Sequence, residues 1–324
     1  MFSGFSTYIN IDIGDNSYYL HVIYSEKIVQ NISFPPQQTN TMPTNPLAMY
    51  MRQPKIYIRL PSGGQYWPVG SIEIPENGQL PVYSMTAKDE LLLNIPDALM
   101  NGQAVVDVIQ NCIPNIKNAW ATPTLDLDAL LIAIRIATYG ELMKTPVKFN
   151  NDVEMDYQVD LRIVLDNLMS SCTWDPVIAI NDQLTVFIKP LTYKQSTAAS
   201  MQSYETQKII ELSNDESMNE TDKLKLFKES FVKLTESTVG IIVNSIDHIE
   251  SLQGSTDNPA HIKEFINNTD KEVFNKIQDR LEELKKMNSV KPMVVAVTDD
   301  MKEKGINGDT VEIPLVFDAS TFFA

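Results

Sequence analysis

The feature that most constrains the fold is the stretch 129–137, in which Arg135 is the only polar side chain. Leu125-Asp126-Leu127-Asp128 precedes it and offers an acidic cap for a helix, and Gly140 stands near its end. A helix that is apolar on nearly every side belongs in the middle of a packed region. We therefore expect a buried helix here, capped by Asp126 or Asp128.

Arg135 is the exception within this apolar stretch. A guanidinium that loses its water must find a partner, because burying an unpaired charge is costly. We expect a structural ion pair with a carboxylate or a contact with a carbonyl. The alternative is that Arg135 contacts another protein.

Strand and helix patterns are both distributed along the chain, which predicts an α+β fold. Residues 6–33 alternate around the turn Gly14-Asp15-Asn16, as in a β-hairpin, and Ile56, Ile58 and Leu60 alternate with polar residues in a second strand region. A short strand is expected at Ile72 and Ile74. The further elements that we expect are helices at 86–95, 103–113, 162–169, 193–212 and 269–284, an extended segment at 145–162, and strands at 177–188, 293–297 and 311–317.

These patterns suggest five parts of the chain. They are an N-terminal β-hairpin (1–33), a Pro-rich arm or linker (34–54), a β-plus-helical core domain (55–144), a small β domain formed by 145–190 with 291–324, and a helical domain (191–290). The arm combines five prolines with almost no charge and cannot build a core of its own. We expect it to lie extended on a neighbouring protein, and to be cut first by protease, between Pro35 and Met51, when that neighbour is absent.

Residues 217–249 carry a helical repeat with two interpretations. Leu224, Phe227, Phe231 and Leu234 recur at intervals of three and four, and Ile241, Ile242, Ile246 and Ile249 continue the pattern. Core packing is the commoner use of such a stripe, and a coiled-coil surface for a partner is the alternative. Capping boxes are expected at Ser217/Glu220 and at Thr269/Glu272, and Thr86 is expected to cap another helix.

Charge and composition exclude several classes of protein. The chain has 26 Lys+Arg against 42 Asp+Glu, a net charge of −16, so a globally basic binder of nucleic acid or anionic membranes is excluded. The longest apolar runs, 129–134 and 292–297, are far shorter than the ~20 residues of a membrane helix. With no signal-peptide pattern at Met1, and with Cys112 and Cys172 as two buried thiols, we expect a soluble cytosolic product.

Few residues suggest chemistry. His21, His248 and His261 lack zinc-site spacing, and we expect structural or surface roles for them. Asp152, Glu154 and Asp156 alternate and could bind a divalent cation or supply an acid/base pair, although an exposed strand face explains them as well. We expect no catalytic, cofactor-binding or metal-binding residue, and the alternative is a metal-dependent enzyme that uses these three carboxylates.

Several blocks of the sequence resemble a known family. The more specific ones are Pro54-Lys55-Ile56-Tyr57-Ile58-Arg59-Leu60-Pro61-Ser62, Leu80-Pro81-Val82-Tyr83-Ser84-Met85-Thr86-Ala87-Lys88-Asp89-Glu90, Val108-Ile109-Gln110-Asn111-Cys112-Ile113-Pro114-Asn115-Ile116-Lys117 and Leu127-Asp128-Ala129-Leu130-Leu131-Ile132-Ala133-Ile134-Arg135. Looser ones are Val159-Asp160-Leu161-Arg162, Lys189-Pro190-Leu191-Thr192-Tyr193 and Phe317-Asp318-Ala319-Ser320-Thr321-Phe322-Phe323. Together they resemble the baseplate hub subunits and hub assembly proteins of T-even-like contractile-tailed phages, over residues 50–324.

The resemblance also shows a departure. It implies two Cys-x-x-Cys pairs, which would hold a structural zinc ribbon. The corresponding stretches, about 147–152 and 296–301, contain neither Cys nor His. We expect a metal-free β element in which these two distant segments are strand partners, with Phe149, Tyr157, Val295 and Val316 filling the place of the metal.

The resemblance implies a non-enzymatic protein that binds other baseplate hub and tail proteins, including the tape-measure protein as a candidate. Two versions remain open. The chain is either a permanent component of the virion tail baseplate or a tail-assembly chaperone that acts in the host cytoplasm and is absent from the virion. A regulatory binding module of the host cell is a further alternative, which the neighbouring genes would decide.

Overall fold

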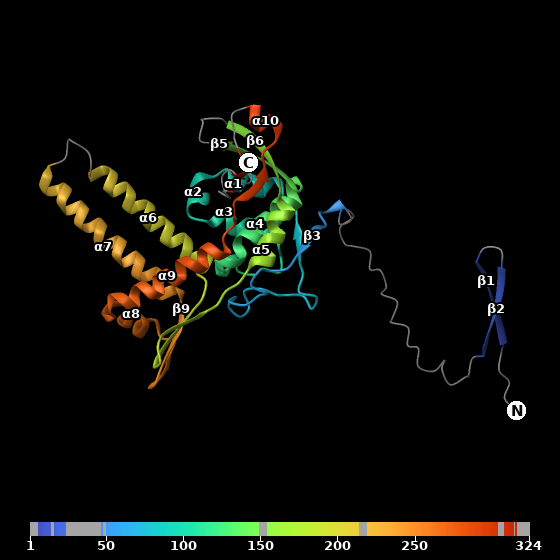
Figure 1. Ribbon diagram of the computed structural model, residues 1–324, viewed down its shortest axis with the longest axis horizontal. Coiled ribbons are helices and arrows are strands. Elements are labelled where there is room, and N and C mark those ends of the chain that lie inside the picture. Colours follow the sequence, from blue (N-terminus) through green and yellow to red (C-terminus); the bar gives the residue numbers. More distant parts are fainter. Residues whose placement is uncertain are drawn as a thin grey trace. The chain divides into compact units, whose positions relative to one another are not determined.

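The computed structural model of the chain describes residues 6–13, 16–23, 47, 50–148, 154–213, 219–303, 308–313 and 315. The chain divides into two compact units, Met1–Met51 and Arg52–Ala324, which are described separately (Figure 1). Most of the predicted arm and the segment in which we expect the first protease cuts lie outside the described residues, as does the capping box expected at Ser217.

The first unit contains an antiparallel hairpin of β1 (Ser6–Ile13) and β2 (Asn16–Ile23). Ser6 lies opposite Ile23, and Ile13 lies opposite Asn16 at the turn. The predicted N-terminal hairpin is therefore confirmed. Its strands are rich in the β-branched and aromatic residues that favour extended backbone.

The second unit combines helices with small antiparallel sheets, which confirms the α+β prediction. Its helices are α1 (Ala87–Leu93), α2 (Pro96–Met100), α3 (Gln103–Cys112), the 3-10 helix η3 (Ala119–Ala121), α4 (Thr124–Tyr139), α5 (Leu161–Ser171), α6 (Tyr193–Ser213), α7 (Glu220–Ser245), α8 (Pro259–Asn268), α9 (Lys271–Asn288) and α10 (Asp299–Glu303). Its strands are β3 (Pro54–Ile58), β4 (Leu80–Tyr83), β5 (Leu142–Lys148), β6 (Glu154–Asp160), β7 (Val177–Asn181), β8 (Leu184–Ile188), β9 (Ile246–Ser251), β10 (Gly254–Thr256), β11 (Met293–Ala296) and β12 (Thr310–Ile313).

Helix α4 is the centre of the larger apolar core, as its sequence predicts. Leu130, Ile132 and Ile134 are fully buried, and the helix packs against β3, β4, α3 and α5. It ends at Gly140, whose φ of 91° is a conformation that favours glycine. The N-cap is Pro123, so the prediction that Asp126 or Asp128 caps this helix is wrong.

The other capping predictions have mixed outcomes. Thr86 caps α1 as expected, and its hydroxyl and backbone N–H are joined to the Asp89 carboxylate in a capping box. At α9 the expected box is wrong, because Asp270 is the N-cap and makes no side-chain cap hydrogen bond. Thr269 is instead the C-cap of α8, and the next residue, Asp270, is the N-cap of α9.

A second core lies between the four-stranded sheet, in the order β10-β9-β8-β7, and the helices α7, α8 and α9. The predicted continuation of the helical pattern through Ile246 and Ile249 is wrong, because α7 ends at Ser245 and both residues lie in β9. Strand β9 pairs with β8, with Ile249 opposite Val186. Pairing with an existing hairpin here outweighs the helical spacing of the apolar residues.

Two strand predictions also need correction. Ile72 forms only an isolated bridge with Ile116, and the partner of β3 is β4, in which Leu80 lies opposite Ile58. Of the segments that we expected to pair as a metal-free ribbon, residues 149–152 lie outside the described residues. The described strands next to these segments form separate hairpins, β5–β6 and β11–β12. Tyr157 of β6 and Val311 of β12 both pack against the buried pair Val297 and Met301. The five-part division of the chain stays a prediction.

Candidate interaction surface

Helices α6 and α7 lie side by side as a long hairpin (Figure 1). Small and polar side chains fill the contact between them. Ser230 of α7 and Thr206 of α6 are buried, and each hydroxyl donates to the carbonyl four residues earlier in its own helix, at 2.8 and 2.7 Å. Nearer the base of the hairpin, Gly240 of α7 and Ala198 of α6 help to line a cavity of about 270 Å³.

Four large apolar residues of α7 form a row beside this contact. We call Leu224, Phe227, Phe231 and Leu234 the exposed stripe. Leu224 is 55% exposed, Phe227 46% and Phe231 53%, while Leu234 is half-buried. The two phenylalanine rings contact each other with their centroids 4.7 Å apart. Core packing, which the sequence favoured for this stripe, is therefore wrong for its first three members.

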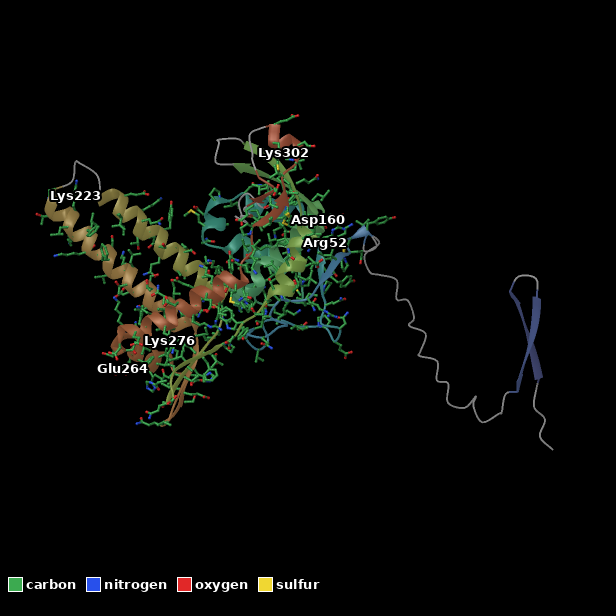
Figure 2. All side chains as sticks on the ribbon, in the orientation of Figure 1. Arg52, Asp160, Lys223, Glu264, Lys276 and Lys302 are labelled. Atoms are coloured by element: carbon green, nitrogen blue, oxygen red, sulfur yellow. The ribbon has the colours of Figure 1, made fainter. Side chains whose placement is uncertain are left out.

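Lysines surround the exposed stripe. Lys223, Lys225, Lys228 and Lys233 fall within eleven residues that contain one acidic residue, Glu229. Within the described part of the chain, none of these lysines makes an ion pair. Lys223 lies near the end of the hairpin that is farthest from the sheet (Figure 2). The surface is therefore apolar and locally cationic on a chain whose net charge is −16.

Arg135 lies half-buried near the C-terminal end of α4. Its guanidinium stands over the ring of Tyr139, 5.3 Å from the centroid, and the Tyr139 hydroxyl donates to Glu90 Oε1 at 3.1 Å. Burial lowers the pKa of Arg135, and the same burial raises the pKa of Tyr139. Arg135 therefore contacts an aromatic ring whose hydroxyl is hydrogen-bonded to the Glu90 carboxylate.

Asp126 holds a loop instead of capping a helix. Its carboxylate is fully buried and accepts hydrogen bonds from the backbone N–H of Ser62 at 2.8 Å, from the Ser62 hydroxyl, and from Trp67 Nε1 at 2.7 Å. Burial raises the pKa of Asp126, and these hydrogen bonds oppose the rise. Burial also raises the pKa of the neighbouring Asp128.

A second polar network, which the sequence did not indicate, lies at the start of the second unit. Arg52 donates through Nη2 to the Asn111 carbonyl at 2.7 Å and to Asn111 Oδ1 at 2.8 Å. Asn111 Nδ2 in turn donates to the buried Asp89 carboxylate at 2.7 Å. The same region buries Cys112, and that burial raises the pKa of its thiol to about 12. Arg52 thereby anchors the start of the second unit.

The predicted carboxylate trio is not tested by the structure. Asp152 lies outside the described residues, as does the side chain of Glu154, and Asp156 is exposed on β6. In the described ranges, no group of three or more His, Cys, Asp or Glu side chains is placed to hold a metal ion.

The histidines and Cys172 take positions of structural or surface type where they are described. His248 stacks on Phe187, with ring centroids 4.2 Å apart, and its Nδ1 lies 2.9 Å from Asp247 Oδ2. His261 is exposed, and the His21 side chain lies outside the described residues. Cys172 is half-buried, which raises its pKa.

The comparisons with known proteins bear on these surfaces. A family model described as T4 bacteriophage base plate protein matches residues 53–296, well over half of the chain. The chain therefore belongs to this family of phage baseplate proteins, which confirms the family resemblance at the level of the baseplate. No curated protein matches the chain, and no solved structure matches it. In the described ranges, no helix combines the length and the apolarity that a membrane-spanning helix requires.

Proposed function

We propose that this chain is a baseplate hub subunit or a hub assembly protein that works by binding other tail proteins and catalyses no reaction. The observation that carries the proposal is the family match over residues 53–296, which takes in both apolar cores and the α6–α7 hairpin. The exposed stripe supports it, because contiguous apolar surface flanked by polar residues is typical of protein interaction sites.

The proposed partners are other hub and tail proteins, the tape-measure protein among them. These proteins would bind the chain in the host cytoplasm during assembly. The test is co-expression of the full chain with each hub and tail protein of the same phage, followed by affinity purification. Stable capture of at least one hub protein is the expected result, and capture of none would overturn the proposal.

Mass spectrometry of purified phage particles separates the two versions of the function. A permanent hub subunit is expected at a constant ratio to the other baseplate proteins. A chaperone is expected in assembly intermediates and not in finished particles.

The absence of catalysis is tested through the carboxylates. A chain carrying Asp152→Asn, Glu154→Gln and Asp156→Asn together should complement tail assembly as well as the wild-type chain. Loss of assembly with retained folding and retained partner capture would favour the enzyme alternative instead.

A further inference from the structure

The exposed stripe has the spacing of a coiled-coil seam. Its four residues follow one another at intervals of three, four and three, and Thr238 and Ile241 continue the series at four and three. Thr238 is exposed, whereas Ile241, which is 37% exposed, lines the cavity between α6 and α7, so the free seam ends at Thr238. At 1.5 Å per residue, the seam from Leu224 to Thr238 is about 21 Å long, which is enough to seat several turns of another helix.

The hairpin leaves Leu224, Phe227 and Phe231 of this seam exposed. Small side chains of α7, such as Ser230 and Gly240, lie toward α6, whereas the two phenylalanines face water. Exposing large apolar side chains while burying serine is the reverse of the usual amphipathic arrangement. The stripe is therefore a surface that association with another helix would bury.

The charges indicate the kind of helix that fits. With Leu224 and Phe227 at the a and d positions of a heptad, Lys223 takes position g and Lys228 takes position e. These are the positions that face the e and g residues of a partner helix and set partner choice. Acidic residues at the flanks of the partner helix would complement both lysines.

A second copy of this chain fits less well. In a parallel pair, the g residue of one helix lies beside the following e residue of the other, so Lys223 would face Lys228 across both flanks. Like charges at these positions disfavour pairing. The charge pattern therefore points away from self-association through this seam.

We propose that the α7 seam docks an acidic amphipathic helix of another tail protein, with apolar residues at intervals of three and four and Asp or Glu beside them. The proposal rests on the proposed function, since it supplies a surface for the partner binding described there. It also assigns a role to the α6–α7 hairpin, which presents the seam away from the two apolar cores.

The first experiment uses the full chain and synthetic peptides. An acidic peptide of about four heptads carries Leu at a and d and Glu at e and g, and a matched basic peptide carries Lys at e and g. Fluorescence anisotropy should show binding of the acidic peptide and at least about tenfold weaker binding of the basic one. Equal binding of both peptides, or binding of neither, would overturn the proposal.

Variants then locate the binding site. Phe227→Ala with Phe231→Ala should weaken binding of the acidic peptide at least about tenfold. Lys223→Glu with Lys228→Glu should exchange the preference, so that the basic peptide binds better. The matched control is Leu252→Ala, because Leu252 is 75% exposed in the turn between β9 and β10 and lies outside the seam. An effect of the control as large as that of the phenylalanine pair would contradict the assignment.

Two further measurements separate the remaining outcomes. Sedimentation of the wild-type chain should show no dimer that depends on the exposed stripe. A dimer that the combined change Phe227→Ala and Phe231→Ala abolishes would mean that a second copy of this chain occupies the seam. In phage, the phenylalanine variant should fail to capture a hub protein that the wild-type chain captures. If the variant captures its partners normally, the seam proposal fails while the proposed function stands. If the wild-type chain captures no partner, the proposed function itself fails.

Discussion

Helices α4 and α7 are both rich in large apolar residues, and the fold treats them in opposite ways. Along α4, ten residues are buried and the second unit packs around it on several sides. Along α7, the larger apolar side chains of the stripe face water while serine is buried. A helix that is apolar on all sides must be buried by its own chain, whereas a single exposed apolar stripe can be buried by a partner protein. The distribution of apolar residues around the helix, more than their number, indicates which outcome to expect.

The largest expected effect is the loss of packing in α4. Ile132→Ala removes a fully buried side chain from the centre of the larger core. We expect the free energy of unfolding to fall by about 2–5 kcal/mol, because both transfer free energy and packing around a cavity are lost. Urea denaturation followed by circular dichroism measures this change. A loss below about 0.5 kcal/mol, typical of surface sites, would show that α4 does not organise the core.

The next effect concerns the carboxylate of Asp126, in the first turn of α4. Asp126→Ala leaves the donors of Ser62 and Trp67 without their shared acceptor. We expect a loss of about 1–3 kcal/mol, the cost of buried donors that lose their hydrogen bonds. Tryptophan fluorescence should also report the change around Trp67. Unchanged stability would mean that the loop does not depend on Asp126.

The pH dependence of stability gives Asp126 a separate signature. Its pKa in the folded protein is raised, so the folded state binds more protons than the unfolded state between the ordinary pKa of about 3.9 and the raised pKa. Between these two pKa values the contribution of Asp126 to the free energy of unfolding falls as pH rises. Above the raised pKa the full cost of burying the charged carboxylate is present. Asp126→Asn should remove this decline when unfolding is measured from pH 3 upward, at about one pH unit per step. A wild-type and a variant curve of identical slope would contradict the raised pKa.

A smaller effect is expected for Arg135, which lies between the two extremes. Its half-buried stem and its contact with the Tyr139 ring are worth about 1 kcal/mol together. Arg135→Ala should lose about that amount, and Arg135→Leu should lose less because leucine keeps the apolar contact. Thermal unfolding of both variants checks the order. Losses of about 3–5 kcal/mol in both would indicate that a buried carboxylate depends on Arg135.

Much of the fold follows from local patterns that leave little choice. The hairpin 6–23, the buried helix around Ile132 and the cap at Thr86 are each specified by residues within one element. The errors arise where an element depends on a distant segment. Ile249 lies in β9 because this segment pairs with the edge of β8. The Asp126 carboxylate accepts hydrogen bonds from Ser62, in a loop that is distant in the sequence, and so does not cap the helix.

The candidate surface was predictable only in part. The interval of three and four residues from Leu224 to Leu234 is visible in the sequence, but it does not say whether this stripe packs on α6 or faces water. The lysines at positions e and g were the signal that could have decided it, because they cannot face a core. Arg52 and Asn111 gave no such signal, since their contact joins segments 59 residues apart.

The smallest expected effect belongs to α7 and completes the comparison. Phe227→Ser removes a ring that is already about half exposed, so we expect the free energy of unfolding of the isolated chain to change by no more than about 0.5 kcal/mol. The matched change one turn further along the same helix is Ser230→Phe, which places a large ring where Ser230 is fully buried. That change should cost about 1–3 kcal/mol through overpacking. If instead Phe227→Ser destabilises the isolated chain as much as Ser230→Phe, the stripe is part of a core within the chain, and the contrast between α4 and α7 disappears. If the order holds, the side chains that α7 buries against its own chain and those that it leaves exposed for a partner lie in adjacent rows of one helix.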